Sequence, residues 1–461
     1  MIPPVAVDLA YIVSAILFVF GLKLLGSPAS ARRGNLFASS AMLLAIVVTL
    51  LEQDILDWRT VALGLILGSL IGAVLARSVQ MTAMPQLVGI FNGLGGGASA
   101  VVAAAEFYRV TGAETIPVSD GATIALSTLI GTVTFSGSMI AFGKLQGVVT
   151  GSPVTFSLQK SFNLLLFLAI VGIAVYLGSG VHDERFYLGL LVLAFLLGVL
   201  LVIPIGGADM PVVISLLNSY SGLAASAAGF VLGNNILIIS GALVGAAGLI
   251  LTQLMCKAMN RSLANVAFGA FGGVDGAAAV DDGDKQVRSV DAEETAMLLS
   301  YSGSVVFVPG YGLAVAQAQH EVRKLMDLLE ERGVTARFAI HPVAGRMPGH
   351  MNVLLAEADV PYDRLFDLDE INPDFERTDV VVVVGANDVV NPAARDPGSV
   401  IAGMPILNVD KARNIVILKR SLSPGFAGID NELFYMDRSM MFFGDAKESL
   451  SGLVKEIREL G

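Results

Sequence analysis

Two glycines that follow an apolar run are the first residues to suggest a chemistry. In VVFVPGYGLAVAQAQ, residues 305–319, an apolar segment leads into Gly310 and Gly312 and then into a helical pattern. A strand, a glycine turn and a helix begin many dinucleotide-binding units, because glycine permits a tight turn and close approach of the backbone to a pyrophosphate. Val315 stands where such motifs have a third glycine, so the motif alone is weak. From it we assign to cofactor binding Gly310, Tyr311, Gly312, Ala314 and Val315.

A second run, IHPVAGRMPGH at residues 340–350, suits a phosphate group. Dinucleotide-binding units usually carry an acidic residue near the end of their second strand to hold a ribose 2'-hydroxyl, and here that residue is missing. Arg346, flanked by glycines, suits a pyrophosphate, although an arginine in a surface turn is the alternative. From this run we assign to cofactor binding Val343, Ala344, Gly345, Arg346, Met347 and Gly349.

A third run ends in Lys419, Arg420 and Ser421, which provide two cations and a hydroxyl. This is the chemistry that a 2'-phosphate needs. Together with the missing acidic residue, it favours NADP over NAD as the cofactor. A solvated run of surface charge is the alternative.

Two further loops complete the candidate site. GANDVVNPAARD places an aspartate at the end of an apolar run, and Asp388 is either a turn residue or a group that titrates beside the ligand. GFAGIDNELFY has glycines on both sides of a compact loop that could fold over a nucleotide. From these loops we assign Gly385, Ala386, Asn387, Asp388, Asn391, Gly425, Phe426, Ala427, Gly428, Asp430 and Asn431.

Short β-rich runs in the last third of the chain position these loops. The runs alternate with helical stretches and cover residues 304–310, 336–342, 379–388, 404–409 and 414–421. This alternation predicts a Rossmann-like α/β domain with a doubly wound parallel sheet. The ligand of such a sheet lies outside the carboxyl ends of its strands, so we expect the loops above to meet at one edge.

The first part of the chain has the composition of a multi-pass α-helical membrane bundle. Overall, 54% of residues are hydrophobic, 15% are charged and the mean hydropathy is +0.71, outside the usual balance of a soluble domain. A bilayer core about 30 Å thick needs roughly 20 apolar residues of helix. That length predicts nine spans, near residues 7–26, 36–52, 59–77, 84–105, 121–143, 162–179, 186–204, 211–231 and 235–256.

Charge divides the chain where the spans end. Residues 1–261 hold 11 Lys or Arg and 10 Asp or Glu, whereas the last 200 residues hold 18 and 30. The acidic excess indicates a soluble surface and gives no support for nucleic-acid binding. We therefore predict a transmembrane domain at 1–261, a flexible linker at 262–294 and a nucleotide-binding domain at 295–461.

Lys and Arg in the short loops give the predicted orientation. They number eight on one side of the bundle and three on the other. The cytoplasmic side of a membrane protein is the more positive one. We therefore expect the C-terminal domain in the cytoplasm and the N-terminus outside.

The membrane part also repeats itself at an offset of 126 residues. MPQLVGIFNGLGGGASA aligns without gaps with MPVVISLLNSYSGLAAS, which pairs Asn92 with Asn218. Such asparagines are either hydrogen-bonding contacts between helices or part of a polar path. All four histidines lie outside the predicted spans, and no carboxylate lies near a span centre. A proton relay would use water held by Asn92, Asn218 and hydroxyls such as Ser136 and Ser138, or an ionisable group of a partner.

Asp209 and Arg261 stand at the predicted cytoplasmic ends of spans. Asp209 is the carboxylate nearest to a proton path, and a helix N-cap is its alternative role. Arg261 is either a positively charged anchor or part of the junction with the soluble domain. The single cysteine, Cys256, excludes an intrachain disulfide, and we expect it to be inert. We predict no metal site.

Several longer runs together resemble one known family. GGADMPVV, CKAMNRS, HPVAGRMPGHMNVLLAEA, GANDVVNPAA and LKRS closely resemble the β subunit of the proton-translocating NAD(P) transhydrogenase, over essentially the whole chain. The resemblance implies a proton-conducting membrane domain and a cytoplasmic domain that binds NADP(H), in an orientation reversed from the usual Rossmann one. It also implies an α partner that binds NAD(H), a dimer of the αβ assembly and a bacterial-type inner membrane.

The resemblance further implies roles for individual residues. Lys419–Ser421 would hold the 2'-phosphate, and Ala344–Gly349 would lie against the pyrophosphate. Asp388 would couple protonation to the nucleotide state, and Gly425–Gly428 would form a lid. Some members carry a histidine where this chain has Asn92, so the resemblance does not assign the membrane proton carrier.

Two other functions remain open from the residues themselves. A channel or transporter gated by a nucleotide-sensing domain would transport without redox turnover. A membrane-anchored dehydrogenase would need its own substrate pocket and acid–base residues. In a transhydrogenase, hydride passes directly between two nicotinamides, so no side-chain nucleophile is required, and none is evident.

Overall fold

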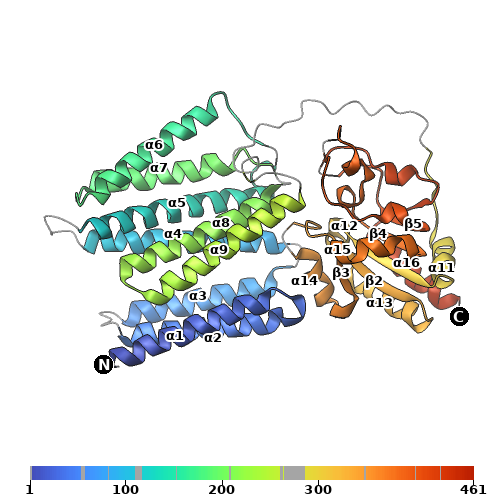
Figure 1. The fold of residues 1–461 in the computed structure, drawn as a ribbon, viewed down its shortest axis with the longest axis horizontal. Coiled ribbons are helices and arrows are strands. Elements are labelled where there is room, and N and C mark those ends of the chain that lie inside the picture. The colour runs from blue at the N-terminus through green and yellow to red at the C-terminus, as the bar shows by residue number, and fades with distance from the viewer. Residues whose placement is uncertain are drawn as a thin grey trace. The chain divides into compact units, whose positions relative to one another are not determined.

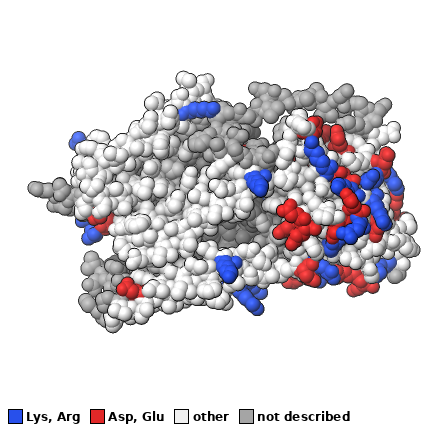
Figure 2. Space-filling view, viewed as in Figure 1, with Lys and Arg blue, Asp and Glu red and all other residues white. Residues whose placement is uncertain are grey.

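The structure is a computed structural model that describes residues 3–52, 58–80, 83–109, 117–151, 153–206, 209–259, 263, 286–346, 349–399, 401–425 and 427–460. The chain divides into two compact units (Figure 1). The helix unit holds the long helices up to Gln253, and the sheet domain holds the described residues from 286 onwards. On the face drawn in Figure 2, charged residues crowd the sheet domain, whereas the surface of the helix unit is mostly uncharged.

Nine helices among the described residues are long and apolar enough to cross a membrane. They confirm the predicted spans to within about a turn at most ends, because in lipid a helix satisfies its own backbone hydrogen bonds. Their bounds are α1 Pro4–Leu25, α2 Pro28–Glu52, α3 Trp58–Ser78, α4 Met84–Arg109, α5 Val118–Gln146, α6 Gln159–Gly178, α7 Glu184–Val202, α8 Met210–Leu232 and α9 Asn235–Ala258.

Helix α5 is the most central element of the helix unit, since it packs against α4, α6, α7 and α8. Small residues allow the close contacts. A Cβ added to Gly131 of α5 would lie 2.6 Å from the carbonyl oxygen of Gly96 on α4, which leaves no space for a side chain. Membrane helices pack in this way because lipid supplies no hydrophobic force between them, and close backbone contact replaces it.

The sheet domain contains one sheet of six parallel strands in the order β3-β2-β1-β4-β5-β6. Five buried valines form β4 at the centre, as expected of a strand covered on both faces. The fold class predicted from the sequence is therefore confirmed. The strands are β1 Ser304–Pro309, β2 Thr335–Ile340, β3 Leu365–Asp367, β4 Val380–Val384, β5 Asn414–Lys419 and β6 Ser439–Phe443.

The helices of the sheet domain follow the strands. α13 and α16 are amphipathic, and α16 packs between α11 and α13. The chain builds the sheet outwards from β1 to β3 and then returns to build β4 to β6 on the other side of β1. β1 and β4 therefore flank the point where the strand order reverses. The helices are α11 Ala292–Ser300, α12 Tyr311–Val315, α13 Gln319–Glu331, α14 His350–Glu357, α15 Leu368–Ile371 and α16 Ala446–Glu459.

The strands predicted from the sequence differ from the observed ones in three places. The apolar run 404–409 was expected to be a strand, but it pairs with no described strand. Ile406 and Leu407 are buried there in irregular chain. An apolar run shows burial, not pairing. β3 was missed because it has three residues, and β6 because its methionines are not strong strand formers.

The start of the sheet domain also differs from the predicted border. Ser289 pairs with Met441 of β6, and α11 begins at Ala292. The last residues of the predicted linker, 289–294, thus belong to the folded domain. Almost all of the remaining linker lies outside the described residues, so the other borders stay predictions.

Candidate functional site

The predicted cofactor-binding motifs meet at one edge of the sheet. Because all strands are parallel, their carboxyl ends share that edge. Gly310 follows β1, His341 follows β2, Gly385 follows β4 and Arg420 follows β5. β1 and β4 lie side by side at the reversal of strand order, where open α/β sheets bind their ligands.

The glycines of the first motif join two strand-end loops. The amide of Gly310 donates to Val384 O and that of Gly312 donates to Gly385 O, both at 2.9 Å. A Cβ on Gly312 would lie 2.6 Å from Gly385 Cα, and one on Gly310 would collide with the backbone of Ala386. Gly385 has φ +65°, which favours glycine. These glycines therefore serve backbone contact between the β1 and β4 loops, a use that the motif did not indicate.

The helix after this motif is shorter than expected. α12 spans only Tyr311–Val315, and α13 begins separately at Gln319 after Gln317 adopts φ +50°. The helix that follows the glycine turn is thus a single turn, not the long helix that usually presents its N-terminus to a pyrophosphate.

Arg346 is held over the β1 loop. Its guanidinium carbon lies 4.5 Å from the centre of the Tyr311 ring, a cation–π contact. Its backbone amide donates to Nδ1 of the buried His350 at 3.0 Å. Gly345 has φ +104°, and a Cβ there would lie 2.5 Å from His350 Nδ1. Burial raises the pKa of Tyr311, while the charge of Arg346 lowers it. The arginine is therefore oriented by its neighbours and is more than a mobile surface charge.

His341 is a structural residue of the same edge that the sequence did not indicate. Its Nδ1 accepts from Val343 N (3.2 Å), so Nε2 carries the hydrogen and donates to Pro405 O (2.8 Å). Burial lowers the pKa of His341 to about 4, against the hydrogen bond to Pro405. The ring is thus neutral and fixes the β2 loop to the chain before η7 (Val409–Lys411).

Asp388 connects the β4 loop to the predicted lid. Its Oδ2 accepts from Ala427 N at 3.0 Å, and its carboxylate lies directly against Gly425, where a side chain would collide with it. The neighbouring Asn387 turns its side-chain oxygen to the same loop. That oxygen accepts from Gly425 N (2.7 Å) and from Lys419 Nζ (3.1 Å). A carboxylate and an amide therefore hold the loop that begins at Gly425.

Lys419 and Arg420 have different surroundings although they are adjacent. Lys419 Nζ donates to Ser423 O (2.8 Å) and lies 4.5 Å from the centre of the Phe434 ring. Burial lowers the pKa of Lys419, and the charges of two nearby aspartates raise it in part. Arg420 is exposed and makes no hydrogen bond or ion pair with the described residues. Ser421 is exposed, and its hydroxyl donates to Ser423 Oγ (2.9 Å). Arg420 is thus the cation most available to an anion.

The residues assigned to cofactor binding fall into two groups by exposure. Most are partly or fully exposed at the strand ends, Val315 with 47% of its surface. The buried ones are Gly310, Ala314, Ala344, Ala386, Asn391 and Asn431. Of the residues assigned to cofactor binding, Met347 and Phe426 lie outside the described residues, as does Arg261 of the predicted proton path.

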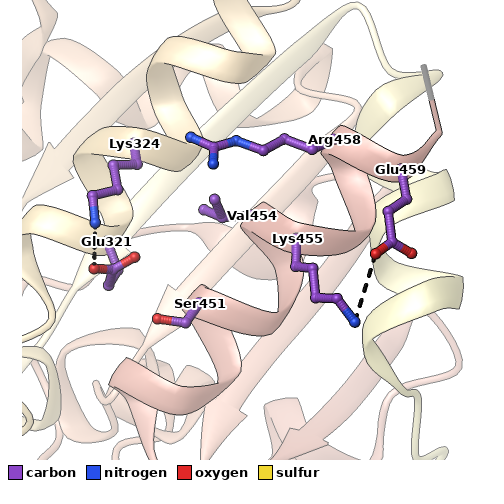
Figure 3. Close-up of a pocket in the computed structure, with 7 residues that line it drawn as sticks. All are labelled: Glu321, Lys324, Ser451, Val454, Lys455, Arg458 and Glu459. Atoms are coloured by element: carbon purple, nitrogen blue, oxygen red, sulfur yellow. Dashed lines mark hydrogen bonds and ion pairs between the residues drawn. The ribbon is translucent and has the colours of Figure 1, made fainter.

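A groove of about 450 Å³ lies elsewhere on the sheet domain, between α13 and α16 (Figure 3). Two of its three cations are accompanied by carboxylates: Lys324 bonds Glu321 at 2.8 Å, and Lys455 lies 3.6 Å from Glu459. None of its lining residues belongs to the motifs at the strand ends. This groove is not the candidate nucleotide site.

In the helix unit, only part of the predicted polar path comes together. Asn92 is buried, and its Nδ2 donates to Ser138 Oγ (2.8 Å). Its backbone carbonyl accepts from Ser221 Oγ (3.1 Å). Its Oδ1 is buried without a hydrogen-bond partner among the described residues. Ser136 instead bonds Thr132 O (3.1 Å) and lies against Gly198 of α7.

Asn218 does not lie as the repeat predicted, and Asp209 stands at one of the two positions that the sequence left open. The repeat predicted equivalent positions for Asn92 and Asn218, yet Asn218 is exposed on α8. The repeat gives the two asparagines equivalent positions along their helices, but the helices around them differ. α4 packs against α5, whereas α8 also packs against α9. Asp209 is the N-cap residue of α8, but its side chain makes no capping hydrogen bond.

The chain is similar to known proteins over nearly its whole length. It matches the family described as NAD(P) transhydrogenase beta subunit over residues 7–456. The chain belongs to this family. Two relatives named NAD(P) transhydrogenase subunit beta, both from Rhodospirillum rubrum, are each 50% identical over 454 residues, which cover 97% of this chain and 98% of the relative. The protein is thus the beta subunit of an NAD(P) transhydrogenase, a multi-pass membrane protein that has an alpha partner.

Several residues around the site of this beta subunit were not predicted from the sequence. Ser423 and Phe434 surround the Lys419 ammonium, and the Tyr435 hydroxyl donates to Asp430 Oδ1 at 3.0 Å. Ser423 follows β5 and belongs to no motif, whereas Phe434 and Tyr435 lie in η8 (Glu432–Tyr435) at the end of the run GFAGIDNELFY and were not assigned from it. The two aromatic residues could have been suggested by their place in that run, and Ser423 by its closeness to Lys419.

Proposed function

We propose that this beta subunit binds NADP(H) at the carboxyl ends of β1, β4 and β5. Hydride would be exchanged with NAD(H) held by the alpha partner, and this exchange would be coupled to proton movement through the helix unit. The observation that carries the proposal is the meeting of Gly310–Gly312, Asn387–Asp388 and Lys419–Ser421 at the strand-order reversal.

The residues at this edge fit a dinucleotide with an extra phosphate. Arg420 and Ser421 are exposed and offer a cation and a hydroxyl for a 2'-phosphate. Arg346, oriented by Tyr311, offers a second cation for the pyrophosphate. β2 ends without the acidic residue that would bind a free 2'-hydroxyl and repel a phosphate there. The charges thus favour NADP(H) over NAD(H).

When bound, NADP(H) supplies the hydride acceptor or donor of the reaction. The chain itself binds and orients it. The Gly310–Gly312 and Gly385 loops fix the floor of the site by backbone hydrogen bonds. Asp388 holds the next loop through Ala427 N. Protonation of this carboxyl would replace a charge-assisted hydrogen bond from Ala427 N by a weaker one and would so loosen the loop. This contact would then connect proton occupancy to nucleotide affinity.

In the helix unit, we propose that Asn92 and Ser138 form part of the proton path, with Ser136, Asn218, Asp209 and Arg261 as further candidates. Asn92 Oδ1 is buried without a hydrogen-bond partner in the described part of the chain, which supports this, since a buried amide oxygen in a membrane needs a donor such as water. A proton that crosses a potential of 100 mV contributes about 2.3 kcal/mol, enough to drive NADP reduction by NADH appreciably.

We further propose that the protein lies in a bacterial-type cell membrane with the sheet domain in the cytoplasm and the N-terminus outside. The transmembrane domain would span 1–261 and the linker would follow it. The alpha partner would carry the NAD(H) site, and two alpha–beta assemblies would form a dimer. The excess of Lys and Arg on one side of the helices supports the orientation.

Vesicles that contain the alpha–beta complex test the function directly. NADH should reduce an NADP analogue, the vesicle lumen should change pH, and an uncoupler should alter the rate of the redox reaction. Redox turnover that leaves the lumen pH unchanged would contradict the coupling. Proton movement gated by nucleotide without redox turnover would instead support the channel alternative.

A further inference from the structure

Two asparagines that the sequence assigned to the nucleotide are buried inside the protein. Asn391 has 0% and Asn431 has 1% of its surface exposed. A ligand that reaches the strand ends from solvent has no access to such side chains. Their amide groups must therefore serve contacts within the protein, and those contacts are specific.

Both amides join the β4 loop to the chain that follows the predicted lid. Asn391 Nδ2 donates to Asp430 O (2.9 Å), and its Oδ1 accepts from Ala393 N (3.0 Å). Asn431 Nδ2 donates to Asn387 O (3.2 Å), and its Oδ1 accepts from Leu433 N (3.0 Å). Each side chain thus uses its donor and its acceptor, as a buried amide must.

Tyr435 completes this group from the other side. Its hydroxyl donates to Asp430 Oδ1 at 3.0 Å, and the same oxygen accepts from Asn431 N at 2.9 Å. Asp430 is therefore held at both its carboxylate and its carbonyl. The next residues, Leu433 and Phe434, are buried in the core of the domain. From Asp430 onwards the chain is firmly fixed.

The chain before Asp430 is held differently. No side chain among the described residues of 420–430 is buried, and Gly428 adopts φ +69° in open space. Ala427 is held by the carboxylate of Asp388. A loop with few buried contacts opens at a lower free energy than its buried neighbours. The boundary between the two kinds of chain lies at Asp430.

We propose that Asn391, Asn431 and Tyr435 are positioning residues that form a fixed anchor at Asp430, and that nucleotide-dependent movement is confined to the chain before it. Asn391 and Tyr435 act through Asp430, whereas the Asn431 side chain fixes the next residue by bonding Asn387 O and Leu433 N. None of the three contacts the nucleotide. The link to nucleotide rests on the proposed function, whereas the anchor itself can be measured without nucleotide.

Hydrogen–deuterium exchange on the purified alpha–beta complex without nucleotide tests the anchor. Tyr435→Phe removes one hydrogen bond and keeps the ring. The amides of Asn431 and Leu433 should then exchange about threefold to tenfold faster, as expected for the loss of one neutral hydrogen bond. Tyr301→Phe is the matched control, because Tyr301 is 88% exposed. Unchanged exchange, or faster exchange throughout β1, β4 and β5, would overturn the anchor.

Substitutions of Asp430 test whether the hydrogen bond from Tyr435 or the negative charge of the carboxylate holds this segment. Asp430→Asn keeps an oxygen for the Tyr435 hydroxyl but removes the negative charge near Lys419, whereas Asp430→Ala removes both. The anchor predicts that exchange at Leu433 is close to wild type in Asp430→Asn and fast in Asp430→Ala. Equal acceleration in both variants would show that charge holds this segment, and the anchor would be rejected.

NADPH release links the anchor to function. The release of bound NADPH can be followed by its own fluorescence after excess NADP is added. NADPH should leave the Tyr435→Phe complex about threefold to tenfold faster than it leaves the wild-type complex. A wild-type release rate despite faster amide exchange would sink the link to nucleotide. If the wild-type complex binds no NADPH, the proposed function fails, and the exchange data alone decide the anchor.

Discussion

Replacing His341 by asparagine should remove a defined part of the pH dependence of stability of the sheet domain. His341 is 1% exposed, accepts from Val343 N and donates to Pro405 O. An asparagine oxygen can still accept from Val343 N, but asparagine does not titrate. The variant therefore loses one hydrogen bond, about 1 kcal/mol at all pH values, and loses the histidine titration.

The size of the pH effect follows from the pKa of His341. Burial lowers it to about 4 in the folded chain, against about 6.5 in an unfolded chain. As the pH falls, the unfolded chain binds the proton first, so the free energy of unfolding decreases. This contribution is complete above about pH 7 and is lost between about pH 6.5 and pH 4. The full loss is about 3 kcal/mol, of which about 2 kcal/mol has occurred at about pH 5.

Urea unfolding of the sheet domain, expressed from residue 286 so that the Ser289 bridge is retained, measures this effect. Between pH 8 and pH 5 the wild type should lose about 2 kcal/mol more than His341→Asn. Carboxylates titrate in both proteins, and their effect cancels in the comparison. Equal losses in the two proteins would refute a neutral, buried His341.

Three further predictions concern the site and the helix unit. Gly312→Ala should destabilise the sheet domain by about 1–3 kcal/mol, since its Cβ would lie 2.6 Å from Gly385 Cα; an unchanged urea midpoint would contradict the loop contact. Arg420→Ala should weaken NADPH binding by about 1.5–3 kcal/mol and leave NADH binding unchanged, because Arg420 is the exposed cation; a calorimetric titration with both nucleotides decides this. Asn92→Leu should block proton pumping in vesicles while Asn92→His retains some, and full pumping by Asn92→Leu would return Asn92 to a packing role.

The membrane part of the fold was predictable because lipid imposes a single requirement. A helix of about 20 apolar residues is visible in composition alone, and α5 was expected at 121–143 and spans Val118–Gln146. The partners of each helix were not predictable in this way. Asn92 and Asn218 match in the repeat, yet one is buried against Ser138 and the other is exposed. Burial depends on neighbouring helices that a local pattern does not record.

In the sheet domain, sequence predicted the edge of the site but not the task of each residue. Strand ends and glycine loops are local features, so the positions of Gly310, Gly385 and Lys419 followed from the pattern. Whether a polar side chain faces a ligand or the protein depends on contacts that are distant in sequence. Asn391 looked like a ligand and instead bonds the carbonyl of Asp430, 39 residues away.

Titration of the purified alpha–beta complex with NADPH and with NADH, the alpha site being blocked by saturating NAD, tests the central claim most directly. Two charge-assisted contacts to a 2'-phosphate, at about 1.5–3 kcal/mol each, predict that the remaining site binds NADPH at least about 100-fold more tightly than NADH. The combined Lys419→Ala and Arg420→Ala variant should remove most of that preference. Equal affinity of the wild-type complex for the two nucleotides would contradict an NADP(H) site on this chain.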